Sequence, residues 1–456
     1  MPPPPYREHP LPHGVASGAA AILRGTGRSV ERAPVTHQLS APARLSLGGV
    51  ALLLVLAGSA LPATASPAGT ASGTARLTVE EERLDRAAPR EILRRSGFDA
   101  LAPRFARALE GSRGYAQAER AVTRHASALW KRAVDRAQGR GPATGDLSRG
   151  DDRPLYWARL ALSRELRTWT PRFGLDDRQR GALHTALETS SRGQDDIRRP
   201  GRQVKRVLVT GFDPFTLDRD VRIGNPSGAS VLALDGTLVR TAEGPARIEA
   251  VVFPVRWTDF AEGAVERALA RQLPHLDVFA TISQGRQGRF DVERTNGAWR
   301  GGFPDNENLS RTGTVPVTDP ASQPQWTSTT LPYRELTEAD TGRFPVYDNT
   351  EVTEIPAGSD RPVTRPDGPT PGSAARAGGG GDYLSNEIAY RATLLRDRLG
   401  LAKLPGGHLH TPVLQFGAGN TDPATGGVTD PEFERNRADI VRQIRALVRT
   451  AVGAAP

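Results

Sequence analysis

The chain has 456 residues, more than one ordinary domain needs, which indicates two to three folded units. It contains no cysteine, and this excludes disulfides, thiolate metal sites, iron–sulfur clusters and a thiol nucleophile. The formal net charge is +9, and all basic residues except Lys131, Lys205 and Lys403 are arginines. Because these arginines are spread among acidic residues and form no single stripe, we expect no nucleic-acid partner.

An apolar segment near the N-terminus is typical of a secretory signal. Residues 45–61 carry no charge, Pro62 ends the run, and residues 63–65 (Ala-Thr-Ala) supply the small side chains that a signal peptidase accepts. We therefore predict an N-terminal extension and signal peptide over 1–65 and a secreted protein without stable membrane association. The alternative is an uncleaved anchor, because 17 residues lie at the lower limit for crossing a bilayer.

The next part of the chain shows helical periodicity alone. After a linker rich in Ser, Thr, Ala and Gly over 66–77, Thr78 and Glu81 have the spacing of a capping box. Apolar residues then recur at helical spacing, with no alternating strand pattern. The sequence predicts a small all-α domain over 78–190.

Beyond a charged linker at 191–203, short apolar runs alternate with helical segments. We expect strands near 206–210, 248–255, 276–282 and 408–416, and helices near 227–234, 259–272, 383–399 and 431–452. This alternation predicts a three-layer α/β/α sandwich with a largely parallel sheet over 204–456. The segment 317–377, rich in Pro, Thr, Gly and Asp, has no period, and we expect an inserted, partly ordered loop.

Ligands of such domains gather where strands end and helices begin. The first strand leads through Gly211 to Phe212 and Phe215, which form either one wall of an apolar pocket or part of the core. Ser385 follows a glycine run and begins a helix. It is either a helix cap or a nucleophile, in which case the helix N-terminus would stabilise the oxyanion.

A nucleophilic serine needs a base, and the last predicted strand offers two histidines. His408 and His410 alternate along that strand and therefore share one face of the sheet. They lack a third ligand at recognisable spacing, so we predict no metal and no cofactor. Glu293 follows the third predicted strand, where it is placed either to orient a histidine or to pair with Arg294 on the surface.

In this order the segments resemble the pyroglutamyl peptidase I family. VLVTGFDPF with Asn225-Pro226-Ser227 is similar to the family's opening Thr-Gly-Phe-x-Pro-Phe and Asn-Pro-Ser. GRFDVERTN resembles the stretch that carries its catalytic glutamate, and GFPDN is similar to its Pro-Asp-Asn. GDYLSNEIAY is similar to the segment of its nucleophilic cysteine, and GHLHTP to that of its catalytic histidine. Where the family has that cysteine, this chain has Ser385.

The resemblance implies an amide hydrolase that removes N-terminal pyroglutamyl groups, so that the partner would be a small peptide or pyroglutamyl amide. By position it implies six site residues: catalytic Ser385, His410 and Glu293, and substrate-binding Phe212, Phe215 and Asn225. Two other hypotheses stay open. One is a catalytically inactive binding protein in which Ser385 only caps its helix, and the other is an envelope-associated interaction protein that acts through its helical domain.

Overall fold

The computed structural model describes residues 76–141, 144–199, 201 and 203–455. The predicted signal peptide lies outside these residues. Within the described part of the chain, every helix is too short or too polar to cross a lipid bilayer.

The N-terminal part of the described chain is helical, as the periodicity predicts. Its elements are α1 (Val79–Glu82), a 3-10 turn (Arg83–Asp85), α2 (Ala87–Ser96), α3 (Leu101–Glu110), α4 (Tyr115–Ala137), α5 (Arg153–Thr168) and α6 (Asp177–Ser191). The capping box is confirmed, because the Thr78 side chain accepts from the Glu81 N–H and the Glu81 carboxylate accepts from the Thr78 N–H. The apolar faces of these helices bury Trp130 and Trp157 almost completely.

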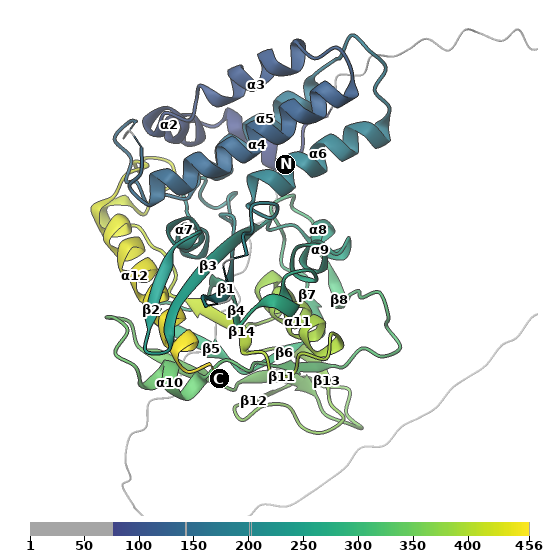
Figure 1. Cartoon of the computed structure of the whole chain (residues 1–456). Coiled ribbons are helices and arrows are strands. Elements are labelled where there is room, and N and C mark those ends of the chain that lie inside the picture. Colours follow the sequence, from purple (N-terminus) through teal and green to yellow (C-terminus); the bar gives the residue numbers. More distant parts are fainter. Residues whose placement is uncertain (1–75, 142–143, 200, 202, 456) are drawn as a thin grey trace, which may run out of the picture. The chain divides into compact units, whose positions relative to one another are not determined.

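One sheet of seven strands has the order β10-β5-β14-β4-β1-β3-β2 (Figure 1). The strands are β1 (Lys205–Phe212), β2 (Leu238–Thr241), β3 (Gly244–Phe253), β4 (Val278–Gln284), β5 (Phe290–Glu293), β10 (Val346–Asn349) and β14 (Gly406–Thr411). The pairs β1–β3, β1–β4, β4–β14 and β5–β10 are parallel, whereas β5–β14 and β2–β3 are antiparallel. The prediction of a largely parallel sheet is confirmed.

Helices cover both faces of this sheet and complete the α/β/α layering. They are α7 (Pro226–Leu234), α8 (Trp257–Ala261), α9 (Ala264–Leu269), α11 (Leu384–Arg398) and α12 (Pro431–Gly453). Side chains alternate along β1, so that Val207 and Val209 join the core under α7 and α12, and Leu208 joins the core under α8, α9 and α11. Because β1 is buried on both faces, its sequence from Val207 to Val209 is a continuous apolar run and does not alternate between apolar and polar residues.

Two elements end earlier than their apolar patterns predict. The helix expected over 259–272 is divided into α8 and α9, because Gly263 takes a left-handed conformation with φ 80°. The last strand, expected over 408–416, stops at Thr411 because Pro412 has no backbone N–H for a neighbouring strand.

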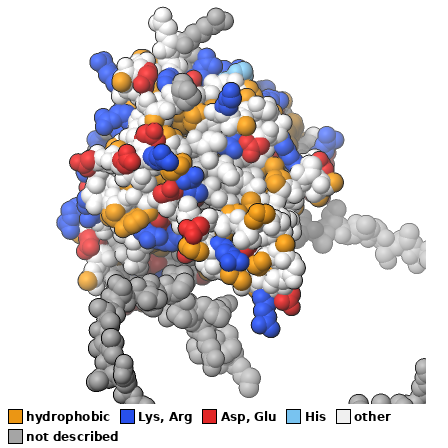
Figure 2. All heavy atoms as spheres, turned by 90° about the horizontal axis from the view of Figure 1, so that it is seen from below, with side chains coloured by type: hydrophobic (Ala, Val, Ile, Leu, Met, Phe, Trp, Pro, Cys, Tyr) orange, Lys and Arg blue, Asp and Glu red, His pale blue; other side chains and the backbone are white. Residues whose placement is uncertain are grey.

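The segment 317–377 is more regular than expected. It contains β9 (Trp326–Ser328), α10 (Tyr333–Glu338), β10, β11 (Val352–Ile355), β12 (Val363–Arg365) and β13 (Ala374–Ala377); before it lie β6 (Thr295–Gly297), β7 (Trp299–Gly301) and β8 (Thr312–Thr314). Strands of three or four residues are too short to show a period in the sequence. Figure 2 views the molecule from below, the side of α10 and β11–β13 in Figure 1, where acidic and basic side chains are intermixed.

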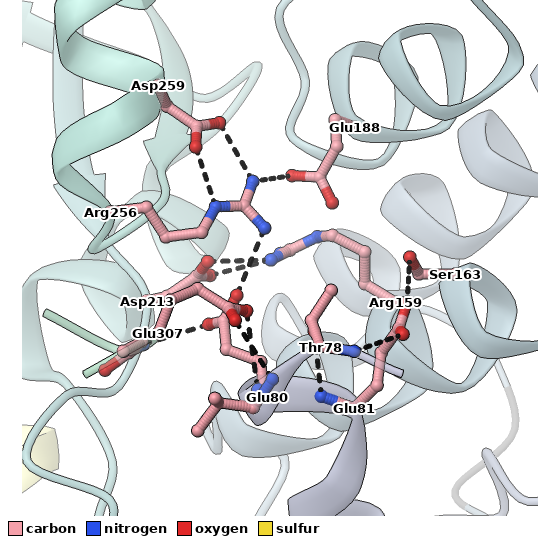
Figure 3. Close-up of polar contacts among 12 residues, drawn as sticks. Thr78, Glu80, Glu81, Arg159, Ser163, Glu188, Asp213, Arg256, Asp259 and Glu307 are labelled. Carbon is pink, nitrogen blue, oxygen red and sulfur yellow. Dashed lines mark hydrogen bonds and ion pairs between the residues drawn. The ribbon is translucent and has the colours of Figure 1, made fainter. Parts of the chain in front are cut away.

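The N-terminal helices share buried ion pairs with the loop that follows β1 (Figure 3). Arg159 of α5 donates to both carboxylate oxygens of Asp213 at 2.9 and 2.8 Å, and Arg192 donates to the same carboxylate at 2.7 Å. All three side chains are buried. One apolar core also joins Trp130 of α4 to Ala250 of β3. The helices therefore hold the loop after β1 in place. The prediction that the helices form a domain of their own, ending at residue 190, stays a prediction.

Glu80 of α1 gives this contact region a pH dependence. Its carboxylate accepts from Tyr156 Oη at 2.8 Å. It also pairs with Arg256 at 3.1 Å (Figure 3). Burial raises the pKa of Glu80 from 4.5 to about 7 against the opposing effect of Arg256. Between pH 4.5 and about 7, Glu80 therefore keeps a proton in the folded chain that it has lost in the unfolded chain. The stability that this proton contributes is present below pH 4.5 and is lost as the pH rises through about 7.

Replacing Glu80 with glutamine, which stays uncharged, should remove this loss. The difference between the free energies of unfolding of Glu80→Gln and of the unmodified chain should change by about 2–3 kcal/mol in favour of the variant as the pH rises from 5 to 8. Urea unfolding at both pH values measures the difference, with the exposed neighbour Glu82→Gln as the control. Parallel pH dependence in the unmodified chain and Glu80→Gln would contradict the prediction.

Candidate active site

A cavity of about 400 Å³ opens where β1, β4 and β14 end and α11 begins. Its apolar lining comes from Phe212, Phe215, Val255, Phe303, Tyr383 and Leu384, and its polar lining includes Ser283, Gln284, Arg286, Ser385 and His410. The carboxyl ends of parallel strands meet at one edge of the sheet, which explains why segments far apart in the sequence converge here.

His410 and Glu293 form an oriented pair at the floor of this cavity. Their strands, β14 and β5, are antiparallel neighbours, and His410 Nδ1 lies 2.6 Å from Glu293 Oε1. Glu293 is fully buried, and His410 is 5% exposed. His410 Nε2 has no hydrogen-bond partner among the described residues, so it is free to meet a ligand in the cavity. This is the geometry of a general base whose ring is held by a carboxylate.

Asn349 at the end of β10 holds the other oxygen of that carboxylate. Its Nδ2 donates to Glu293 Oε2 at 2.6 Å and to the Gly379 carbonyl at 3.1 Å. A Cβ atom at Gly379 would overlap the Glu293 carboxylate, so this position needs glycine for the close approach. The inserted segment and the glycine run therefore both position the Glu293–His410 pair.

If the Glu293–His410 pair acts as an oriented base, removing the Asn349 amide should lower the rate of its reaction while the chain stays folded. In Asn349→Ala the Glu293 carboxylate loses a charge-assisted hydrogen bond, and we expect kcat to fall about tenfold. Steady-state rates with a pyroglutamyl amide, the substrate that the sequence resemblance implies, measure this. The neighbouring Thr350→Ala, whose hydroxyl donates to the Pro366 carbonyl, should leave kcat unchanged. An unchanged kcat in Asn349→Ala would show that the pair is held without it.

Ser385 lies in the first turn of α11, and its hydroxyl donates to the Gly380 carbonyl at 2.9 Å. No hydrogen bond joins it to His410 in the described part of the chain. The two residues nevertheless line the same cavity on either side of Gly380, where an added Cβ would lie 3.2 Å from His410 Cε1. The first backbone N–H groups of α11 have no intrahelical acceptor, as in any α-helix, and the side chain of the N-cap residue Tyr383 does not cap them. They are positioned to stabilise an anion.

The predicted substrate-binding residues also line the cavity. Phe212 stacks on Phe260, with ring centroids 6.1 Å apart, and Phe215 lies against Tyr383 at 6.2 Å. Asn225 has its polar atoms engaged, since Nδ2 donates to the Asp213 carbonyl at 2.9 Å and Oδ1 caps α7. Asn225 therefore shapes the wall, and one N–H of its side-chain amide has no hydrogen-bond partner among the described residues.

Of the six predicted site residues, five line the cavity and Glu293 lies behind His410. Sequence reasoning did not identify Asn349, which lies in the segment without periodicity. It also did not identify Ser283, whose only signal is its place at the end of an apolar strand. His408 was recognised as a neighbour of His410, and it packs edge-on against that ring with centroids 4.7 Å apart.

Comparison with solved structures finds pyroglutamyl peptidases. The chain is similar to a mutant pyrrolidone carboxyl peptidase from Pyrococcus furiosus, with 20% identity and a TM-score of 0.36 over 54% of this chain and 97% of that one. It is also similar to pyroglutamyl peptidase I from Bacillus amyloliquefaciens, with 20% identity and a TM-score of 0.38 over 55% and 95% of the two chains. At this identity and TM-score the likeness says nothing of activity.

Comparison at the level of sequence identifies a family. The model of the PA0049 N-terminal domain matches residues 63–188, and that of the PA0049 C-terminal domain matches 206–320 and 343–415. The chain is 34% identical to the uncharacterized protein PA0049 of Pseudomonas aeruginosa over 495 aligned residues, which cover 82% of this chain and 89% of the relative. The protein belongs to the PA0049 family.

Proposed function

We propose that this protein is an amide hydrolase that removes N-terminal pyroglutamyl groups from peptides. The observation that carries the proposal is the Glu293–His410 pair, joined at 2.6 Å, whose free Nε2 lies at a cavity with an aromatic wall. The cavity offers apolar rings to a flat lactam and a helix N-terminus to an oxyanion. The order of the sequence motifs gives the same assignment.

In this proposal Ser385 is the nucleophile. Its Oγ attacks the carbonyl carbon of the pyroglutamyl amide while His410 Nε2 takes the hydroxyl proton, and Glu293 stabilises the imidazolium that forms. The N–H groups at the start of α11 stabilise the oxyanion. His410 then gives the proton to the leaving amine, and water releases the acyl group by the same steps.

A second candidate is a binding protein on the same scaffold. The specific observation in its favour is the hydrogen bond from Ser385 Oγ to the Gly380 carbonyl, which leaves His410 without the serine as a partner. For catalysis the Ser385 hydroxyl must leave this carbonyl and donate to Nε2. A side chain with one rotatable bond makes that change readily once a ligand displaces water from the cavity.

An assay of the purified full chain distinguishes the hydrolase from the binding protein. It measures the release of a fluorogenic amine from a pyroglutamyl amide. Turnover above the level of the matched Ser385→Ala chain supports the enzyme. A rate equal to that of Ser385→Ala, together with measurable binding of pyroglutamyl amide, supports the binding protein. Activity that emerges only in Ser385→Cys would identify a site shaped for a thiolate, which forms far more readily than an alkoxide.

We further propose that the enzyme is exported, on the basis of the uncharged residues 45–61 and the small residues at 63–65. Expression in a secreting host followed by mass spectrometry of the product tests this. The expected mature N-terminus is Ser66. A full-length product that stays with the membrane fraction would favour the uncleaved anchor.

A further inference from the structure

His408 is a buried histidine that the proposed mechanism does not use. Three hydrogen bonds connect its ring and the neighbouring hydroxyls, and the donor in each can be inferred from its surroundings. The ring lies between two hydroxyls of β4, with Nδ1 2.7 Å from Thr281 Oγ1 and Nε2 2.8 Å from Ser283 Oγ. Thr281 Oγ1 also donates to the Gly407 carbonyl at 3.1 Å. His408, Thr281 and Ser283 are all buried.

Hydrogen counting assigns the tautomer of this ring. A hydroxyl has one hydrogen, and with that of Thr281 donated to the Gly407 carbonyl, Thr281 accepts from His408 and Nδ1 carries the ring hydrogen. A Thr281 hydroxyl turned to Nδ1 would instead place the ring hydrogen on Nε2, and the carbonyl contact is what favours the first arrangement. Burial, and after it the nearby His410, lowers the pKa of His408 well below its ordinary value, so the ring is neutral. Nε2 therefore has a lone pair and accepts the hydrogen of Ser283.

Ser283 consequently presents only acceptor character to the cavity. It lines the cavity together with His410, and its single hydrogen is directed to His408. A ligand group that meets Ser283 Oγ must bring an N–H or O–H of its own. An ether or carbonyl oxygen of a ligand at the same place would face the lone pairs of Ser283 Oγ. Neither oxygen would then have a hydrogen to donate, and no hydrogen bond would form between them.

The same Ser283–His408 contact also has the geometry of a nucleophile with its base. Two features oppose that reading. In the described part of the chain, Nδ1 of His408 meets a hydroxyl and no carboxylate, so nothing there stabilises an imidazolium. The burial that keeps this ring neutral also opposes proton transfer from Ser283. The pair is therefore suited to accepting a hydrogen bond.

We propose that Ser283 selects acyl groups that carry a ring N–H, a role that rests on the proposed function for its choice of substrate. The pyroglutamyl lactam has this N–H, and the matching lactone has a ring oxygen in its place. The direction of the Ser283 hydrogen, set by His408 and Thr281, is what discriminates between these two nearly isosteric groups.

Binding to the full chain carrying Ser385→Ala tests the inference separately from turnover. Isothermal titration compares pyroglutamic acid amide with 5-oxotetrahydrofuran-2-carboxamide, the lactone analogue. We expect the lactam to bind about tenfold to a hundredfold more tightly, and the preference to disappear when Ser283→Ala is added. Ser96→Ala is the matched control, because its hydroxyl donates to a helix carbonyl, that of Leu93, outside the cavity lining, and the preference should stay.

A second variant tests the hydrogen direction while Ser283 stays in place. In Thr281→Val the acceptor for Nδ1–H is lost, so the ring hydrogen should move to Nε2 and free Ser283 to donate. The lactam preference should then fall, and ¹⁵N spectra of labelled histidine should report the change of tautomer.

Three results would overturn the inference: no lactam binding, equal binding of lactam and lactone, or a preference retained in Ser283→Ala. Ser283-dependent lactam binding without any turnover of the unmodified chain would remove the proposed catalysis alone and leave the selectivity intact.

Discussion

Replacing His410 with alanine is expected to lower kcat/KM for a pyroglutamyl amide by about 10³-fold or more. In the proposed mechanism the Ser385 hydroxyl loses its proton during attack, and His410, whose Nε2 has no partner among the described residues, takes it at the cavity that both residues line. Its ring is fixed through Nδ1 by Glu293, so Glu293→Gln, which disturbs the tautomer, should cost about 10²–10⁴-fold. Initial rates over a range of pH measure both effects.

The pH profile distinguishes loss of the base from a general structural effect. In His410→Ala the limb that reports deprotonation of the base should disappear, and added imidazole should restore part of the rate by entering the cavity. His275→Ala is the matched control, since His275 is exposed at the end of a 3-10 turn and does not line the cavity. A His410→Ala chain with unchanged kcat/KM would remove His410 from the mechanism.

Replacing Asp213 with alanine is expected to cost about 3–5 kcal/mol of unfolding free energy. The change removes the loop carboxylate with which the guanidinium groups of Arg159 and Arg192 pair. Both groups stay buried, since each is at most 3% exposed. Asp213 also follows Phe212 directly, so the wall of the cavity should loosen. We therefore expect a raised KM in whatever fraction of the variant is folded.

Urea unfolding followed by tryptophan fluorescence measures this loss of stability. The control is Asp146→Ala, which removes an exposed ion pair with Arg95 and should leave stability nearly unchanged. Equal stabilities for the two variants would mean that water reaches the Asp213 site and that the buried network contributes little to stability. Thermal midpoints at fixed pH provide an independent comparison.

The elements with long, regular patterns could be predicted from the sequence. The helical spacing of apolar residues expected within 78–190 is seen most clearly in α4 (Tyr115–Ala137), whose apolar residues repeat over about six turns after Gly114. The break at Gly263 could not be predicted from periodicity, because apolar spacing continues across it while the backbone does not. Only the left-handed conformation of that glycine ends the helix.

The candidate site could be predicted in part, because strand order brings known ends together. Phe212 and His410 lie at the ends of β1 and β14, and Ser385 lies at the start of α11. Their convergence at one edge of the sheet therefore follows from the α/β pattern. Asn349 meets Glu293 across 56 residues through an edge strand too short to recognise. The partner of the Ser385 hydroxyl depends on a single side-chain rotation, which no sequence pattern specifies.

The buried contacts between the N-terminal helices and the loop after β1 bear on how the chain matures during synthesis. Arg159 emerges from the ribosome more than fifty residues before Asp213, its partner. Until that carboxylate arrives, a nascent α5 carries a guanidinium that has to stay hydrated, and this opposes early collapse of the helices onto one another. We therefore expect the earlier part of the polypeptide to close only once the first β-strand is complete, the step that also builds one wall of the cavity.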